Sequence, residues 1–339
     1  MTTTPEAYVH LSEVLKTLTF CYDTLRADCY GTTWGIRGTK DDYDWTANLV
    51  PPNTTVLTVV FDASFRDFRP TTTAGWFTGL RSLKSIEGFE HLNTSQVTDM
   101  SRMFEGCESL TALDLSNFDT SKVTVMNRMF AGCESLTALD LSSFNTAKVT
   151  DMSWMFNGCD SLTALDISSF NTAKVTDMSC MFADCQSLTA LNLSNFDTAK
   201  VTDMNGMFNF CLSLTALDIS SFNTAKVTKM NGMFNYCESL AALDISSFDT
   251  AKVTGMSRMF SRCQSLTALD LSNFDTAKVT DMNGMFWGCK SLTALDLSNF
   301  DTAKVTRKSR MFWGCRSLTA LDPVEFRKFL VEEYKGDVL

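Results

Sequence analysis

Residues 103–126 read MFEGCESLTALDLSNFDTSKVTVM, and this segment decides the fold because it recurs along the chain. Its opening Met-Phe pair is found nine times at a constant period of 26 residues, with no insertion or deletion. The pairs begin at Met103, Met129, Met155, Met181, Met207, Met233, Met259, Met285 and Met311. A degenerate tenth unit precedes them at Trp76-Phe77. A fixed period of this length predicts a solenoid, in which each unit buries its apolar side against its neighbours.

The leucines of each unit predict a strand. Leu110, Leu113 and Leu115 have the spacing L-x-x-L-x-L, which is the strand core of a leucine-rich repeat. Side chains two residues apart on a strand point to the same face, so Leu113 and Leu115 share one face. Stacking of the units then predicts a right-handed coil with a parallel β-sheet on one face.

The segment at residues 123–132 has a different spacing. Met126, Met129, Phe130 and Cys133 follow an i, i+3, i+4, i+7 pattern, which favours a helix. We expect about two turns of α or 3₁₀ helix in this part of each unit. The expected fold class is therefore an α/β repeat solenoid, similar to leucine-rich repeats, with short helices or 3₁₀ turns outside the sheet.

Both ends of the chain depart from the repeat, which predicts three regions: 1–75, 76–322 and 323–339. The first is expected to be a β-rich cap, with strands at Thr17–Tyr22 and Thr54–Phe61 and a turn at Pro51-Pro52-Asn53. The second is the ten-coil solenoid. Pro323 interrupts the strand pattern, and Val324–Tyr334 is expected to form a helical C-terminal cap. Caps are needed because terminal coils would otherwise expose their core.

The unit M-F-x-G-C-x-S-L-T-A-L-D-L-S-x-F-D-T-x-K-V-T-D-M resembles the repeat of BspA-like leucine-rich-repeat surface proteins, and a similar repeat occurs in mycoplasma lipoproteins. The resemblance covers about residues 75–322. The stretch from Val59 to Phe65, with Arg69-Pro70 and Trp76-Phe77 after it, resembles the entry segment of these proteins. This resemblance implies a role at a bacterial cell surface, in adhesion to host matrix proteins and in coaggregation.

Composition restricts the partners. The net charge of -10 over 339 residues argues against nucleic acid, because binding phosphates requires a basic surface. No apolar run approaches the roughly 20 residues that span a bilayer, so membrane insertion is not expected. Met1–His10 has no basic or apolar leader region. We therefore expect a cell-surface or secreted protein if an upstream leader was removed, and a cytoplasmic protein otherwise. Nothing in the sequence sets the oligomeric state.

Nine of the twelve cysteines form one column of the repeat. They are Cys107, Cys133, Cys159, Cys185, Cys211, Cys237, Cys263, Cys289 and Cys315. Nine equivalent sites cannot all pair, and zinc clusters such as C-x-x-C are absent, so we interpret the column as core. So many free thiols suit a reducing setting. No metal and no cofactor is expected.

Three polar columns accompany the core. An acidic column from Asp114 to Asp322 is expected to face outward, balanced by hydrogen bonds to nearby hydroxyls or by bound cations. A lysine column from Lys122 to Lys304 is expected to be a solvated edge. The threonine columns favour turn and cap hydrogen bonds. An ice-binding threonine array is a minor alternative, although the close T-x-T pairing expected of one is missing.

Catalytic motifs are absent from the sequence. The two histidines, His10 and His91, lie in unrelated places, and identical carboxylates on every coil do not provide two different environments for acid–base work. We therefore expect no enzyme activity.

The differences between units point to a binding surface. Four positions of each unit vary freely around the Met-Phe pair and the cysteine, and several hold Trp, Tyr, Phe or Arg, the residue types enriched at binding hot spots. The candidate binding residues are Trp154, Phe210, Tyr236, Arg258, Trp287, Arg310 and Trp313. Neutral drift at exposed positions is the competing interpretation.

These observations predict a non-enzymatic binding or adhesion module that recognises a protein or a glycan, most simply a bacterial surface adhesin. The alternative is an intracellular or phage-associated scaffold for protein interactions, suggested by the missing leader and the free thiols. The ligand itself is not identified by the sequence.

Overall fold

The computed structural model describes residues 4–39 and 55–319 of the chain. The chain divides into two compact units, one of residues 1–149 with 158–170 and one of residues 150–157 with 171–339. Each unit is described by itself, and they are called unit 1 and unit 2. The predicted turn at Pro51-Pro52-Asn53 and the predicted helix at Val324–Tyr334 lie outside the described residues.

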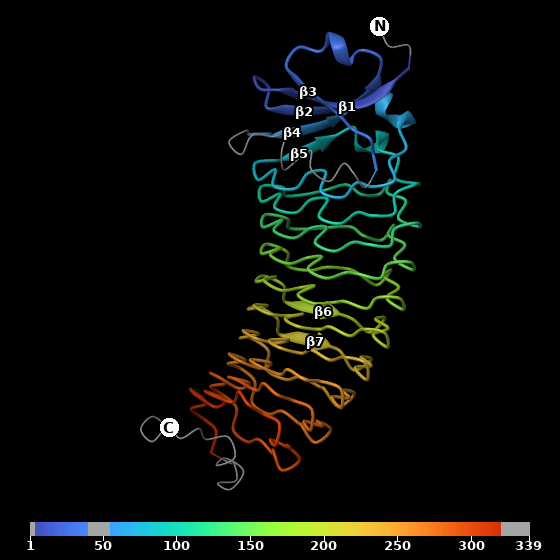
Figure 1. The fold of residues 1–339 in the computed structure, drawn as a ribbon. Coiled ribbons are helices and arrows are strands. Elements are labelled where there is room, and N and C mark those ends of the chain that lie inside the picture. Colours follow the sequence, from blue (N-terminus) through green and yellow to red (C-terminus); the bar gives the residue numbers. More distant parts are fainter. Residues whose placement is uncertain (1–3, 40–54, 320–339) are drawn as a thin grey trace. The chain divides into compact units, whose positions relative to one another are not determined.

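Unit 1 begins with a five-stranded sheet in the order β3-β1-β2-β4-β5 (Figure 1). The strands are β1 (Glu6–Ser12), β2 (Thr17–Asp23), β3 (Thr32–Gly35), β4 (Thr58–Phe61) and β5 (Ser85–Glu87). β1 pairs antiparallel with β2 and β3, whereas β4 pairs parallel with both β2 and β5. The strand predicted at Thr17–Tyr22 is confirmed as β2, and the one predicted at Thr54–Phe61 is confirmed over β4. β1 and β3 were not predicted.

Aromatic packing joins this sheet to the first coils of unit 1. Three 3₁₀ helices flank it: η1 (Arg26–Asp28), η3 (Ala63–Asp67) and η4 (Phe89–His91). The Phe20 ring stacks on Phe61 at 4.5 Å and on Trp76 at 5.4 Å, measured between ring centroids. Phe77 then stacks on Phe104 at 5.3 Å, and Phe104 stacks on Phe130 at 5.6 Å. The core of the β-rich region thus continues into the phenylalanine column of the repeat.

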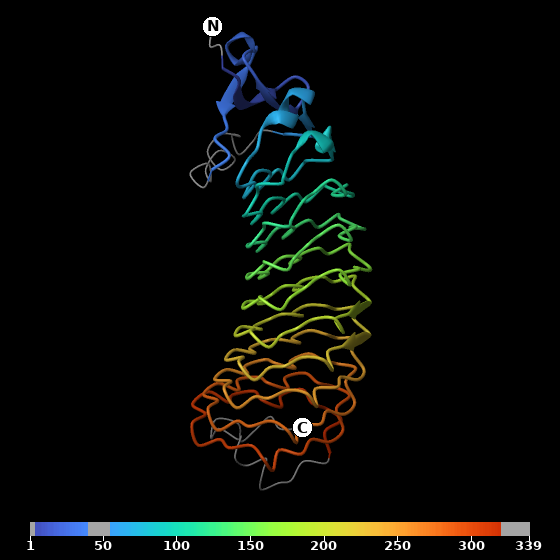
Figure 2. The same cartoon turned by 90° about the vertical axis from the view of Figure 1, so that its right-hand side faces the viewer.

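Unit 2 is a stack of coils (Figures 1 and 2), and it buries the same apolar columns as unit 1. The valine, methionine, phenylalanine and cysteine columns are buried in its described coils up to Cys289. Rings of the phenylalanine column stack nearly parallel from Phe156 to Phe312, with centroid distances of 5.6 to 5.8 Å. Each core residue therefore packs on its own copy in the next coil.

The helix predicted at residues 123–132 is wrong, because this segment is a succession of β-turns. Main-chain N–H groups there bond three residues back, as from Met129 to the Met126 carbonyl (3.3 Å) and from Ala131 to the Arg128 carbonyl (3.1 Å). Arg128 and Gly132 have φ of 57° and 70°, in the left-handed region that a right-handed helix excludes. Left-handed residues four positions apart turn the chain so that Met126, Met129, Phe130 and Cys133 all point inward. This is the spacing that a helix would also give.

The remaining N–H groups of this turn segment bond the next coil. In unit 1, the N–H groups of Met100, Arg102 and Phe104 donate to carbonyls 25 residues further along, at 2.9 to 3.0 Å. Isolated parallel bridges recur beside these bonds, from Thr72 to Val125 in unit 1 and from Asp151 to Arg307 in unit 2. Most of the main-chain pairing between coils is therefore on the turn segment.

The parallel sheet predicted at the leucines is present only in part. Within the described residues of the repeat, strands occur there only at β6 (Ala190–Asn192) and β7 (Ala216–Asp218), which pair parallel with Ala190 opposite Ala216. The acidic column takes a main-chain donor within its own coil, both outside these strands and at their ends. Asp114 accepts from the Ser116 N–H at 3.0 Å, and Asp218 of β7 accepts from the Ser220 N–H at 3.1 Å.

Buried threonines connect successive coils. The Thr224 hydroxyl donates to the Asp249 carbonyl and accepts from the Asp249 N–H, both at 2.8 Å. Thr198 bonds Asn223 in the same two ways in unit 2, and Thr94 bonds Asp119 so in unit 1. One hydroxyl therefore satisfies both main-chain groups of a residue in the next coil. The threonine columns were expected to form turn and cap hydrogen bonds, whereas these hydroxyls bond the main chain of the next coil.

The cysteine column lies in the core, as predicted. None of the nine thiols forms a disulfide, and all nine are buried. Each Sγ lies 3.0 to 3.3 Å from the carbonyl oxygen of a phenylalanine in the preceding coil, as between Cys133 and Phe104. Burial raises the pKa of the Cys133 and Cys263 thiols to about 12. Cys21, Cys29 and Cys180 are half-buried.

We expect Thr224→Val to lower the free energy of unfolding by about 1–3 kcal/mol, because both main-chain groups of Asp249 lose their partner. Urea unfolding followed by circular dichroism measures this change. Thr228→Val is the matched control: the Thr202 carbonyl that accepts from the Thr228 hydroxyl also accepts from the Thr228 N–H at 2.9 Å, which the valine retains. A loss as large in the control as in Thr224→Val would contradict the proposed clamp.

We expect iodoacetamide at pH 8 to modify Cys29 and Cys180 of the native protein while leaving the eight column cysteines from Cys107 to Cys289 unmodified. Those eight are fully buried, and thiol reactivity requires an accessible thiolate. Peptide mass spectrometry before and after denaturation measures the labelling, and all twelve cysteines should react once the chain is unfolded. Rapid native labelling of Cys133 or Cys237 would show that the core opens.

Candidate functional site

Two of the four variable positions of each coil have left-handed backbone. One is the residue before Met-Phe and the other is the residue before the column cysteine. The first set comprises Arg102, Arg128, Trp154, Cys180, Gly206, Gly232, Arg258, Gly284 and Arg310, with φ between 52° and 62°. The second comprises Gly106, Gly132, Gly158, Asp184, Phe210, Tyr236, Arg262, Gly288 and Gly314, with φ between 58° and 81°. Turns with φ > 0 at their third residue explain why glycine is frequent at both.

Side chains at these positions carry a conformational penalty. A left-handed residue other than glycine costs roughly 1–2 kcal/mol. Four consecutive coils nevertheless hold Asp184, Phe210, Tyr236 and Arg262 where five other coils have glycine. Strained side chains retained at one place on a scaffold are a reason to look for function there.

In unit 2 some of the side chains at left-handed positions stack with two neighbouring tryptophans, and we call this stack the aromatic–guanidinium ladder. Its members are Phe210, Tyr236, Arg262, Trp287, Trp313 and Arg310. Phe210 stacks on Tyr236 at 4.2 Å between centroids, and Trp287 stacks on Trp313 at 6.0 Å. The Arg262 guanidinium lies between them, 5.4 Å from the Tyr236 ring centroid and 5.0 Å from that of Trp287. Arg310 lies over Trp313 at 5.1 Å.

The ladder is partly open to solvent. Trp313 is 46% exposed, which makes it one of the few large hydrophobic residues with an exposed side chain in the described part of the chain. Phe210, Tyr236, Arg262 and Trp287 are half-buried. Stacking between aromatic rings and guanidinium groups holds these side chains in place before any ligand arrives.

Polar atoms without partners lie beside the ladder. Asn235 and Ser261 are 7% and 0% exposed, and Asn235 Oδ1 and Ser261 Oγ have no hydrogen-bond partner. Arg262 Nε is likewise buried without a partner. The other end of the Asn235 amide is used, since its Nδ2 donates to Asn209 Oδ1 at 2.7 Å. Buried polar atoms are usually paired, so three unpaired ones on neighbouring coils mark this region.

Basic side chains predominate near this end of the ladder. Residues 257–269, 283–295 and 309–319 contain no acidic residue, and Asp281, in the turn segment at 279–288, forms an ion pair with Arg307 at 2.7 Å. The three segments contain five basic residues: Arg258, Arg262, Lys290, Arg310 and Arg316. A locally positive surface on a chain of net charge -10 favours partners with the opposite charge.

Five of the seven predicted binding residues come together in the ladder: Phe210, Tyr236, Trp287, Arg310 and Trp313. Arg258 is exposed at a left-handed position in the same unit and forms no ring contact or ion pair with the described residues. Trp154 is half-buried on a coil two repeats before that of Phe210, and so lies beyond the ladder. Their role in binding stays a prediction.

Arg262 was not among the predicted site residues, although it stands at the centre of the ladder. The residues of its column are glycine, aspartate, phenylalanine, tyrosine and arginine. A single arginine in such a variable column is also what neutral drift would produce. The informative signal was the position of Arg262 in the repeat. Tyr236 holds the same position in the preceding coil, and Trp287 holds the adjacent position in the next coil.

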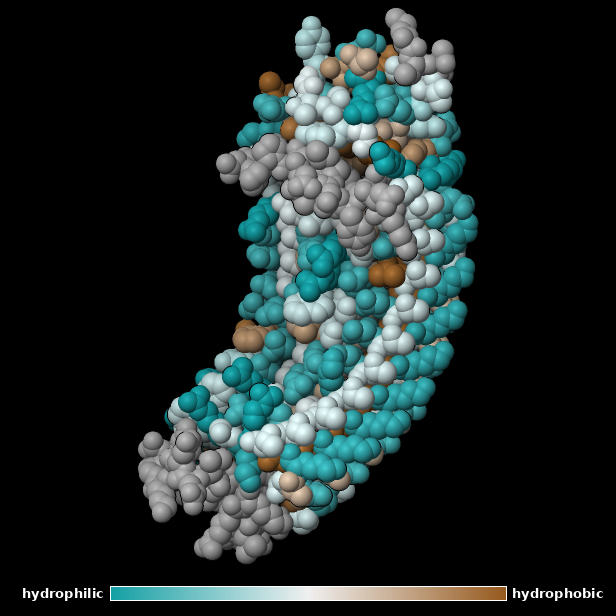
Figure 3. Space-filling model, viewed as in Figure 1, coloured by the Kyte–Doolittle hydropathy of each residue, from teal (hydrophilic) through white to brown (hydrophobic). Residues whose placement is uncertain are grey.

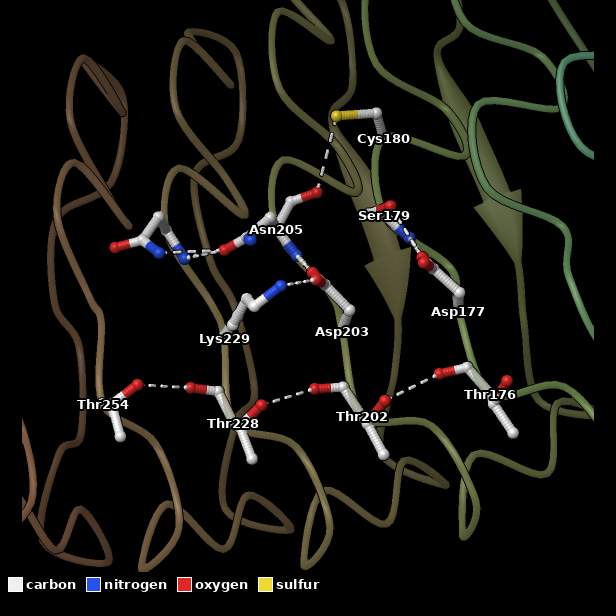
Figure 4. Close-up of polar contacts among 11 residues, drawn as sticks. Thr176, Asp177, Ser179, Cys180, Thr202, Asp203, Asn205, Thr228, Lys229 and Thr254 are labelled. Atoms are coloured by element: carbon white, nitrogen blue, oxygen red, sulfur yellow. Dashed lines mark hydrogen bonds and ion pairs between the residues drawn. The ribbon is translucent and has the colours of Figure 1, made fainter.

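A second row of polar side chains crosses the coils of unit 2 (Figure 4). The hydroxyls of Thr202, Thr228 and Thr254 each donate to the carbonyl of the corresponding threonine one coil earlier, at 3.2 Å. Beside them, Lys229 Nζ forms an ion pair with Asp203 Oδ2 at 2.7 Å. On the face drawn in Figure 3, such rows of hydrophilic and near-neutral side chains follow one another across the coils. These hydroxyls bond the chain itself, in agreement with the structural interpretation of the threonines.

The outward acidic column is explained by local hydrogen bonds. Asp218 accepts from both the N–H and the hydroxyl of Ser220, at 3.1 and 2.7 Å, whereas Asp244 accepts from the Ser246 N–H at 2.9 Å. Bonds to these serines lower the pKa of both carboxyl groups. Hydrogen bonding to nearby hydroxyls was the expected compensation, and the serine main-chain N–H groups add to it.

Other classes of site have no counterpart in the described residues. No group of three or more His, Cys, Asp or Glu side chains in residues 4–39 and 55–319 is arranged to hold a metal ion. Over the same residues, no helix is long and apolar enough to cross a membrane.

Three solved structures illustrate the structural similarities of the chain. A leucine-rich cell surface protein of Faecalibacterium prausnitzii is 14% identical, covers 97% of this chain and 98% of its own, and has a TM-score of 0.33. Leucine-rich repeat proteins of Eubacterium ventriosum and Bacteroides ovatus are 15% and 16% identical, with TM-scores of 0.37 and 0.29. They cover 99% and 92% of this chain, and 98% and 92% of their own. No curated protein sequence matches significantly.

The repeat itself defines the family. Residues 71–190, 158–243 and 237–323 match the family described as "Mycoplasma protein of unknown function, DUF285". Together these segments span well over half of the chain, and they confirm the resemblance to the mycoplasma repeat. The chain therefore belongs to the DUF285 family of leucine-rich-repeat-like proteins.

Proposed function

We propose that this protein is a non-enzymatic binding module that holds a macromolecular ligand on the turn segments of unit 2, through the aromatic–guanidinium ladder. The observation that carries the proposal is the run of Phe210, Tyr236 and Arg262 at positions where glycine would be less strained. Three strained side chains that also stack on one another support selection for a ligand-binding surface over neutral drift.

The proposed setting is the surface of a bacterial cell, where the protein acts as an adhesin. Family resemblance supports this role, since BspA-like repeats are associated with surfaces and adhesion. Preorganised aromatic and arginine side chains are the groups that dominate the energy of protein interfaces. A surface of this kind supports adhesion without any chemical step.

An intracellular scaffold is the second candidate, and one observation favours it. None of the twelve cysteines forms a disulfide, which suits a reducing compartment. The two roles use the same surface and differ in the location of the protein, so a localisation experiment separates them.

We expect the triple variant Phe210→Gly, Tyr236→Gly, Arg262→Gly to remain folded and to lose binding by at least about tenfold. Glycine removes the ring and guanidinium contacts but relieves the backbone strain at each position. The measurement is binding of the labelled protein to arrays of immobilised host matrix proteins and glycans, together with the thermal midpoint. Asp184→Gly is the control, because it has the same left-handed conformation one coil before the ladder. Array binding that survives the triple substitution would refute this site.

We expect protease treatment of intact source cells to remove the chain, because an adhesin is accessible from outside. Immunoblotting of shaved and unshaved cells measures the loss, and a ribosomal protein that stays intact shows that the cells did not lyse. Persistence of the chain in shaved cells, with loss after lysis, would replace the adhesin role with the scaffold role.

A further inference from the structure

Arg262 differs from the other charged residues of unit 2 in its surroundings. Its guanidinium is held between the rings of Tyr236 and Trp287, and its main-chain N–H donates to the Trp287 carbonyl at 2.6 Å. Nε is buried without a hydrogen-bond partner, and Arg262 takes part in none of the ion pairs among the described residues. The charge is therefore fixed in position but not neutralised by a carboxylate of the described chain.

The stacking leaves a particular part of each group accessible. Ring faces of Tyr236 and Trp287 are occupied by Arg262 on one side and by Phe210 and Trp313 on the other. What remains for a ligand is the edge of each ring and the in-plane N–H fork of the guanidinium. Ring edges carry partial positive charge, and the fork matches the two oxygens of a carboxylate.

This arrangement favours a peptide over a sugar. Glycans stack their apolar faces on an open aromatic face, and the faces of the central rings are already covered. An extended acidic peptide presents carboxylates and main-chain carbonyls, which are the oxygens that ring edges and guanidinium N–H groups prefer. A peptide lying along the ladder would cross a new coil about every 4.8 Å, so more than one of its residues would meet the ladder.

Charge in the neighbouring turn segments points the same way. Arg258, Lys290, Arg310 and Arg316 lie on the coils around Arg262, and residues 257–269, 283–295 and 309–319 contain no acidic residue. Glu238, on the coil of Tyr236, accepts a hydrogen bond from Gln264. Ser261, whose buried Oγ has no hydrogen-bond partner, directly precedes Arg262, and its hydroxyl can donate to a carboxylate.

We propose that the Tyr236–Arg262–Trp287 sandwich is a carboxylate subsite for an extended acidic segment of a protein partner. This inference rests on the proposed binding function and names the chemical class of its ligand. Arg262 donates to the carboxylate, and Tyr236 and Trp287 hold the guanidinium plane so that little freedom is lost on binding.

The test uses the full chain and fluorescein-labelled peptides of eight glutamates or eight glutamines, with binding measured by fluorescence anisotropy. We expect saturable binding of the glutamate peptide, and binding of the glutamine peptide at least about tenfold weaker. Arg262→Gln should weaken glutamate binding at least about tenfold, and Arg262→Lys should rescue less than half of that loss, because lysine has no planar fork. Unchanged thermal midpoints would show that both variants are folded.

Lys252→Gln is the charge-matched control, since Lys252 is exposed in the lysine column of unit 2 and is not part of the ladder. It should weaken binding less than about twofold, as expected of a screened surface charge. Equal losses in Lys252→Gln and Arg262→Gln, or tighter binding of an oligomer of galacturonic acid than of the glutamate peptide, would overturn the subsite. If the triple glycine variant loses its array ligands while Arg262→Gln retains them, the binding function stands and the carboxylate subsite fails.

Discussion

Main-chain hydrogen bonds between the turn segments of successive coils are the constraint on which the rest of the structure depends. Every second N–H group there reaches a carbonyl 25 residues further along the chain, as from Phe104 to Met129. One extra or missing residue would shift each following donor away from its acceptor. This requirement explains why nine units keep a period of 26 residues without a single insertion or deletion.

A strict register also determines which residues are identical between units. Each inward side chain packs against its own copy, so Phe208 meets Phe182 and Phe234, and the Cys211 thiol meets the Phe182 carbonyl. A side chain of another size in one coil would disturb two neighbours as well. Residues whose side chains point outward do not have to match their copies in the neighbouring coils. The conserved interior and the variable surface are therefore two results of the same stacking.

The repeat fold could be predicted from the sequence because its period and its apolar columns are directly visible. The strand at Thr17–Tyr22 and the core position of Cys133 followed from alternation and from the impossibility of pairing nine equivalent thiols. The turns at residues 123–132 could not be predicted, because Met126, Met129, Phe130 and Cys133 have the spacing of a helix. Left-handed backbone at Arg128 is a property of the stacked coils, and arginine gives no local sign of it. Arg262 was missed for a related reason: its stacking partners come from the coils before and after it. The predicted handedness of the coil stays a prediction.

The two left-handed positions of each coil allow the surface residues to change while the residues of the interior stay the same. Any residue other than glycine has the same backbone penalty at these positions in every coil, and glycine removes that penalty. The side chains there can therefore change without any change in the interior. Duplication of a single unit copies an intact interior together with two new positions for diversification. Adding or removing one unit would thus lengthen or shorten the variable surface while the interior of every other coil stays the same.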